Sequence, residues 1–286
     1  MLLINRLLRI QGELMIGMLA RQARRVSPEF ADQGGQPALR VRSEDGLSTL
    51  LIGTPGTARP SDDEIAAVIR LQPPAVRARL VLAVYGPEGP GGLAAAPGQP
   101  SLAQRLADRF ARPVRAYHGV LLAGPLGPRT AVDRAGRPGW SPFALLSTYR
   151  PGQTGAVVDR WRAPFAGAQP IGPARYRLTA DWSIDLAPAG LVIRRVAAPA
   201  DPSLRAAPTD PDRVDLVIDA GDGVRLPDDM LTSLGRLADA LPTEARARLR
   251  VVLTPGLPTI SARALRWAVP APQEGAGPVS DRWSAR

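Results

Sequence analysis

The residues of this chain that could do chemistry are few, and they stand where predicted strands end. Tyr85 follows an apolar run, and His118, the single histidine, lies at or near the end of another predicted strand. Asp219 and Asp222 follow a third run and lie three residues apart. Catalytic groups in open α/β sheets favour the carboxyl ends of strands. These four residues are therefore our candidate site residues.

None of these residues belongs to a complete catalytic or metal-binding motif. A histidine can act as a general base, but the chain has no cysteine, and no serine stands in a Gly-x-Ser-x-Gly elbow. Two carboxylates three residues apart can share a cation. However, the Gly- and Asp-rich sequence around Asp219 and Asp222 is also typical of a turn. We therefore predict no metal site and leave the catalytic residues unassigned.

A glycine-rich loop, Gly86–Gly92, follows one predicted strand and precedes a helix, which is where a phosphate could be held. Its spacing matches neither the dinucleotide-binding fingerprint nor the P-loop. The chain also contains no lysine, so it cannot supply the P-loop lysine. We expect no nucleotide and no other cofactor.

Composition indicates a globular protein: the chain has 286 residues, 45% of them hydrophobic, and a net charge of +10. All of its basic residues are arginines, scattered among acids without a dense basic run, so we see no strong signal for nucleic acid. No apolar run approaches the roughly 20 residues of a membrane span. We expect a cytoplasmic protein unless the chain belongs to a larger exported one.

Two segments repeat one order of elements. In the first, a strand ends at Gly53, Pro60-Ser-Asp-Asp-Glu64 opens a helix, and Arg77-Ala-Arg-Leu80 leads into a second strand. In the other, Pro227-Asp-Asp229 and Arg246-Ala-Arg-Leu249 hold the corresponding places. Apolar strands joined by a helix indicate parallel crossovers. We predict an α/β fold with a mainly parallel sheet built from these two strand–helix–strand repeats.

The repeats lie between segments of different character, which gives five predicted regions. They are an amphipathic N-terminal helix (1–26), the first α/β unit (38–123), a β-rich insertion (124–196), the second α/β unit (213–258) and a mobile tail (259–286). Apolar residues at spacings of three and four support the helix. It could pack on its own domain, bind a partner or form a coiled coil, or lie on a membrane surface.

The segment from Leu80 to Gly119 resembles a known family. Its first strand ends in Ala83-Val-Tyr-Gly86, its helix reads Ser101-Leu-Ala-Gln-Arg-Leu-Ala-Asp108, and its next strand begins Pro113-Val-Arg-Ala-Tyr117. The order resembles the segment around the nucleophile of caspase-like peptidases. It is more similar to the repeat module of giant actinobacterial toxin-like proteins with a "lonely Cys" domain.

The resemblance implies a copy without catalysis. Tyr85 stands about where that family has its cysteine, and Ile52-Gly-Thr-Pro55 stands where it has His-Gly. Both catalytic positions are absent, so no active-site residue can be carried over. The resemblance implies a non-catalytic interaction or scaffold module of a toxin-like or surface-associated protein.

Two functional hypotheses follow. The first is this non-catalytic module with a protein partner, for which the helix of residues 1–26 is a candidate binding element. The second is a hydrolase of unassigned chemistry with a cleft at the carboxyl ends of the strands, lined by Tyr85, His118, Asp219 or Asp222. The hydrolase requires these side chains to converge within hydrogen-bond reach of a reacting atom.

Overall fold

The computed structural model describes residues 40–44, 47–56, 58–87, 99–121, 129–133, 135–199, 201–221, 226–254 and 284–285. The fold below refers to these residues. The predicted N-terminal helix, most of the predicted tail and the candidate site residue Asp222 lie outside them.

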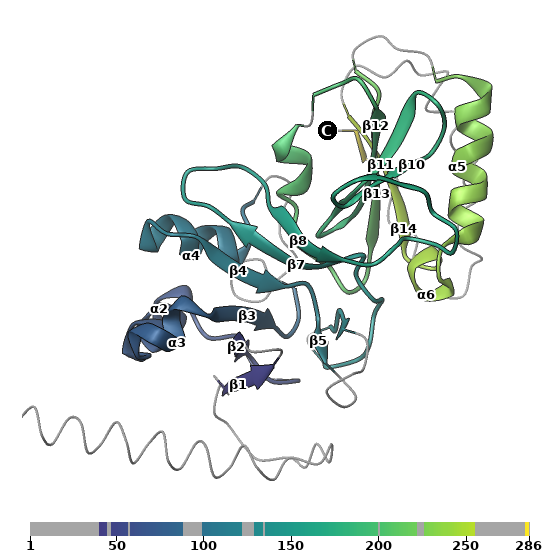
Figure 1. Ribbon diagram of the computed structural model, residues 1–286. Helices are drawn as coiled ribbons and strands as arrows, with labels where there is room; N and C mark the ends of the chain where they lie inside the picture. Colours follow the sequence, from purple (N-terminus) through teal and green to yellow (C-terminus); the bar gives the residue numbers. More distant parts are fainter. Residues whose placement is uncertain are drawn as a thin grey trace, which may run out of the picture.

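The first sheet has six strands in the order β1-β2-β3-β4-β7-β8 (Figure 1). They are β1 (Arg40–Glu44), β2 (Leu47–Ile52), β3 (Leu80–Val84), β4 (Val114–Tyr117), β7 (Ala144–Tyr149) and β8 (Val157–Trp161). Strands β2, β3 and β4 are parallel to one another, whereas β1, β7 and β8 pair antiparallel with their neighbours.

Three helices join the parallel strands of this sheet: α2 (Asp62–Leu71), α3 (Pro74–Ala78) and α4 (Leu102–Phe110). Helix α2 begins with a capping box, in which the Ser61 hydroxyl accepts from the Glu64 N–H and the Glu64 carboxylate accepts from the Ser61 N–H. Such a box satisfies two backbone donors that the helix start would leave without partners. Buried side chains of α2 and α4 then pack with β2 and β3.

The second sheet has seven strands in the order β15-β14-β13-β12-β11-β10-β9. They are β9 (Pro170–Gly172), β10 (Arg175–Arg177), β11 (Trp182–Ala187), β12 (Gly190–Arg195), β13 (Val214–Asp219), β14 (Leu249–Leu253) and β15 (Ser284–Ala285). Strands β12 to β15 are parallel, and β9 to β12 are antiparallel. Helices α5 (Asp228–Ala240) and α6 (Thr243–Arg246) connect β13 to β14 on one side of the sheet (Figure 1).

A small sheet and a shared core complete the described fold. Strands β5 (Val120–Leu121) and β6 (Arg129–Thr130) form an antiparallel pair over the first sheet. Phe143, Ala144 and Val158, from the β7–β8 region, pack in the same hydrophobic cluster as Ile184 and Leu216 of the second sheet. The two large sheets therefore share apolar contacts.

The prediction of a mainly parallel α/β fold built from two repeats is wrong. In the described residues the fold is sheet-rich and mixed, and antiparallel strand pairs outnumber parallel ones. The reason is where the strands between the repeats pair. Strands β7 and β8 extend the first sheet beyond β4, and β9 to β12 extend the second beyond β13. Two mixed sheets result instead of one parallel sheet.

The two crossovers β2–α2–α3–β3 and β13–α5–α6–β14 nevertheless share one register. Ser48 pairs with Leu80 as Val214 pairs with Leu249, and each strand pair continues in step for five residues. In both units the N–H of the residue after the second strand donates to the carbonyl oxygen of the last paired residue of the first strand (Tyr85 to Ile52, 2.9 Å; Thr254 to Ile218, 3.2 Å).

The short helices of the two crossovers also match. Arg77 in the first unit and Arg246 in the second each donate a 3.4 Å hydrogen bond to the carbonyl oxygen seven residues earlier, near the end of the preceding long helix. The paired strand positions of the two units can therefore be equated one by one.

Candidate binding groove

A cavity of about 350 Å³ lies on the face of the second sheet that turns away from α5. Val192, Val217 and Val252 form its floor, one each from β12, β13 and β14, and they pair directly across the three strands. Their strand neighbours Leu216 and Ile218 pack in the core that includes α5, because successive side chains of a strand alternate between its faces. The volume is in the range of ligand sites. We call this cavity the groove.

One wall of the groove is a short 3₁₀ helix, η2 (Pro202–Arg205), and the residues around it. Asp201 caps η2: its carboxylate accepts hydrogen bonds from the backbone N–H and the hydroxyl of Ser203, both at 2.8 Å. Aspartate before a proline suits this position, since the capping oxygen satisfies a free N–H and proline has none to lose. The cap keeps the Asp201 carboxylate in the lining of the groove.

Asp219 lines the groove at the carboxyl end of β13. Burial raises the pKa of its carboxyl group, and the nearby negative charge of Asp201 raises it further. A hydrogen bond from the Gly221 N–H and the charge of Arg194 oppose this rise without cancelling it. Asp219 is thus a carboxylate that the surrounding residues compensate incompletely.

The third carboxylate of the groove, Asp215, is fully paired. Both of its oxygens accept hydrogen bonds from Arg250 on the neighbouring strand, each at 2.9 Å. Its side chain is buried, and the two-point contact is the strongest geometry for such a pair. In contrast, Asp201 and Asp219 form no ion pair with any residue that the structure describes.

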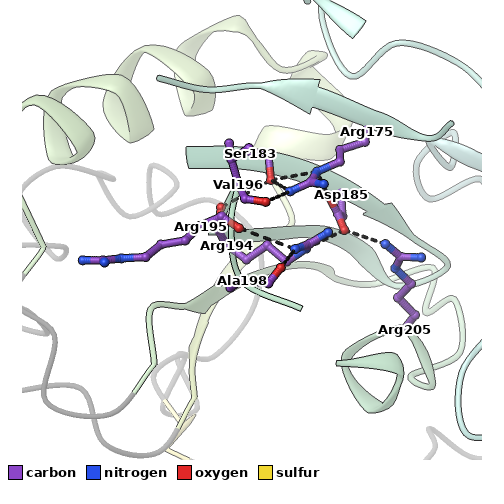
Figure 2. A network of polar contacts seen from close by, with 8 residues as sticks. All are labelled: Arg175, Ser183, Asp185, Arg194, Arg195, Val196, Ala198 and Arg205. Atoms are coloured by element: carbon purple, nitrogen blue, oxygen red, sulfur yellow. Dashed lines mark hydrogen bonds and ion pairs between the residues drawn. The ribbon is translucent and has the colours of Figure 1, made fainter. Parts of the chain in front are cut away.

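A polar network beside the groove fastens η2 to the sheet (Figure 2). Its centre is Asp185 of β11, which is 1% exposed. Three guanidinium groups converge on this carboxylate: Arg175 at 3.2 Å, Arg194 at 2.8 Å and Arg205 at 2.5 Å. Arg194 also donates to the carbonyl oxygen of Ala198. Since Arg205 belongs to η2, its ion pair holds the groove wall in place.

The structure places His118 in the interior of the first sheet. The side chain is 1% exposed, and its Nε2 lies 2.8 Å from the Oγ of Ser147, which is also buried. Burial lowers the pKa of His118 to about 3, so the imidazole is neutral at physiological pH. It forms an internal hydrogen bond and borders neither described cavity.

Tyr85 lines a much smaller cavity, of about 20 Å³, on the first sheet beneath β5 and β6. Thr49, Leu51 and Ala83 line it as well. By the shared register, these four residues correspond to Asp215, Val217, Val252 and Thr254, all of which line the groove. The two cavities therefore occupy equivalent places on the two units, and the one that contains Tyr85 is almost filled.

The candidate site residues do not come together. Asp219 lies in the groove, Tyr85 in the small cavity of the other sheet, and His118 in the interior behind it. Sequence reasoning missed Asp201 and Asp215. The signals for both were present: Asp-Pro-Ser is a capping pattern for Asp201, and strict alternation in Val214-Asp-Leu-Val-Ile-Asp219 places Asp215, Val217 and Asp219 on one face.

Comparisons with protein-family models, with curated proteins and with solved structures return no match for this chain. Among the described helices, none has the length and hydropathy needed to cross a bilayer.

Proposed function

We propose that this chain is a non-catalytic binding module for a protein partner, and that the partner binds in the groove over β12, β13 and β14. The observation that carries the proposal is the makeup of the groove. Its floor is a continuous row of valines, and its polar groups stand at the wall and the ends. Binding sites are commonly apolar concavities in which a few placed polar groups fix orientation.

The separation of the candidate site residues supports a role without catalysis. General acid–base and nucleophilic catalysis need their groups within hydrogen-bond reach of one another. Tyr85, His118 and Asp219 lie in three different places. Within its described lining, the groove contains neither a histidine nor a tyrosine.

One observation favours the alternative, a hydrolase. Asp201 and Asp219 line the same groove, and the pKa of Asp219 is raised by burial and by the charge of Asp201. Two carboxyl groups whose environments differ can divide the roles of acid and base. The test below therefore includes turnover as well as binding.

The test uses the full chain and a degenerate library of decapeptides, with fluorescence anisotropy as readout. Val217→Phe fills the floor of the groove, and Val157→Phe makes the same change on the exposed strand β8. We expect saturable peptide binding that Val217→Phe weakens at least about tenfold and Val157→Phe leaves unchanged. Thermal unfolding of both variants confirms that they fold.

Two results would contradict the proposal. Peptide affinity that is insensitive to Val217→Phe would remove the groove as the binding site. Hydrolysis of peptide, ester, phosphoester or glycoside substrates that Asp219→Asn abolishes would establish the hydrolase instead.

A further inference from the structure

The charges around the groove do not balance locally. Asp201, Asp215 and Asp219 line it, and Asp215 is matched by Arg250. Arg194 and Arg205, beside the groove, both form their ion pairs with Asp185. Two carboxylates in the groove therefore lack an ion-pair partner among the described residues, on a chain whose net charge is +10.

Such carboxylates favour a cation supplied from outside. Asp219 is half-buried and Asp201 is exposed at the groove wall. An opposite charge that enters such a partly desolvated site is held more strongly than it would be in bulk water. The raised pKa of Asp219 has the same origin, because burial and Asp201 both disfavour its charged form. A bound cation would stabilise that form.

The shape of the groove restricts which cation fits. The floor of Val192, Val217 and Val252 is apolar and runs across three strands. Arginine and lysine have aliphatic stems that cover apolar surface while their charged heads reach polar groups. Within the described residues, no group of three potential metal ligands is close enough to hold a metal ion.

We infer that the groove receives an arginine or lysine side chain of the partner, with its cationic head at Asp201 and Asp219 and its stem on the valine floor. This inference rests on the proposed function and names the chemistry of that partner. The first unit supplies an internal contrast. There Gly53 and Thr49 stand at the positions of Asp219 and Asp215, and Tyr85 takes the position of Thr254. The cavity of the first unit has no carboxylate in its described lining, and at about 20 Å³ it is too small for an arginine or lysine side chain.

The first experiment titrates the full chain with n-butylguanidinium and with n-butylurea, its neutral analogue of the same shape, by ligand-detected NMR. A charge-assisted hydrogen bond contributes enough that we expect a preference of about tenfold or more for the cation. The Asp201→Asn/Asp219→Asn double variant keeps the cap of η2, because asparagine also caps helices well. In this variant the preference should fall below about twofold.

Asp229→Asn is the matched control. It removes an exposed carboxylate at the start of α5, across the sheet from the groove, and should leave the preference unchanged. Equal binding of n-butylguanidinium and n-butylurea by the unmodified chain would overturn the inference.

The second experiment separates a protein partner from a small cation. A peptide selected from the library is synthesised with arginine, lysine or citrulline at one position. We expect citrulline to weaken binding about tenfold relative to arginine, and the peptide to bind more tightly than free n-butylguanidinium. A free cation that binds as tightly as the peptide would overturn the assignment to a protein side chain.

The failures of the two proposals are distinguishable. A citrulline peptide that binds as well as the arginine peptide, yet remains sensitive to Val217→Phe, overturns the cation inference and leaves the groove as the binding site. Insensitivity to Val217→Phe overturns the proposed function itself.

Discussion

Burial of His118 makes the stability of the folded state depend on pH in mild acid, although this residue is not placed for catalysis. Its pKa is lowered to about 3 by desolvation, whereas an unfolded chain has a histidine pKa of about 6.5. Between these values the unfolded state binds more protons than the folded state. Stability contributed by the neutral imidazole is therefore complete above pH 6.5 and declines as the pH falls toward 3.

The resulting prediction concerns the change in stability with pH. Going from pH 7 to pH 5 should lower the free energy of unfolding by about 2 kcal/mol through this one residue. His118→Gln, which keeps a hydrogen-bonding group near Ser147, should remove that part of the slope. Urea unfolding of both chains at pH 7 and pH 5 measures it, and no other histidine contributes because the chain has only one. Equal slopes would contradict the burial of His118.

Sequence reasoning at this scale identified one residue of the groove, Asp219, and paired it with Asp222, which lies outside the described residues. It identified Tyr85 by its place after a strand, and the structure does place Tyr85 beside a cavity. Which groups share a cavity depends on contacts between distant segments. Asp201 belongs to the groove wall that the ion pair of Arg205 with Asp185, twenty residues earlier in the chain, helps to hold.

The short helix η2 contains no buried residue, and two contacts fasten it: the ion pair of Arg205 with Asp185 and a hydrogen bond from the Ala156 N–H to the Arg205 carbonyl oxygen. Arg205→Gln should free the helix from Asp185, which leaves Asp185 paired with Arg175 and Arg194. We expect faster amide hydrogen exchange in residues 203–206 and weaker peptide binding in the groove, with exchange in β13 unchanged. Local opening is common where few buried contacts hold a segment.

Arg137→Gln serves as control for this prediction. Arg137 forms an ion pair with Asp133, but its side chain is 81% exposed. The same chemical change there should therefore leave hydrogen exchange in residues 203–206 and peptide binding nearly unchanged. If exchange in residues 203–206 is the same in Arg205→Gln as in the unmodified chain, the network does not hold η2.

The sequence pattern that the two units share predicted strand–helix–strand segments, and β13 and β14 pair in parallel as β2 and β3 do. Local signals suffice at this scale. A proline ends α2 at Pro73 and another precedes α6 at Pro242, and apolar runs mark the strands on either side. The wrong inference was that the two units would share one sheet, because nothing in a strand's own residues states which edge it will join.

The whole molecule is held together where the two large sheets meet. Trp140 is fully buried in the larger core, and its Nε1 donates a 2.7 Å hydrogen bond to the carbonyl oxygen of Asp210, seventy residues later in the chain. Trp140→Phe keeps an aromatic ring in the core but leaves that carbonyl without this donor. The expected loss in free energy of unfolding is about 1–3 kcal/mol.

Calorimetry gives a second readout of the same variant. The unmodified chain should unfold in one transition, and Trp140→Phe should broaden it if this contact couples the sheets. Trp161→Phe, at a partly exposed position on β8, is the control and should change stability by less than about 0.5 kcal/mol. A Trp140→Phe chain as stable as the control would show that the contact contributes little to the coupling.

The matching register of the two units also bears on how the chain avoids misfolding. Strands with the same length and register are competitors, since β13 could in principle pair with β3 and β2 with β14. The ion pair between Asp215 and Arg250 discriminates against this exchange, because the equivalent neighbours in the first unit are Thr49 and Val81. Exchange would place a buried carboxylate beside valine and a guanidinium beside threonine, and an uncompensated buried charge is strongly destabilising. The ion pair between Asp215 and Arg250 thus favours the pairing of β13 with β14 over the pairing of either strand with β2 or β3.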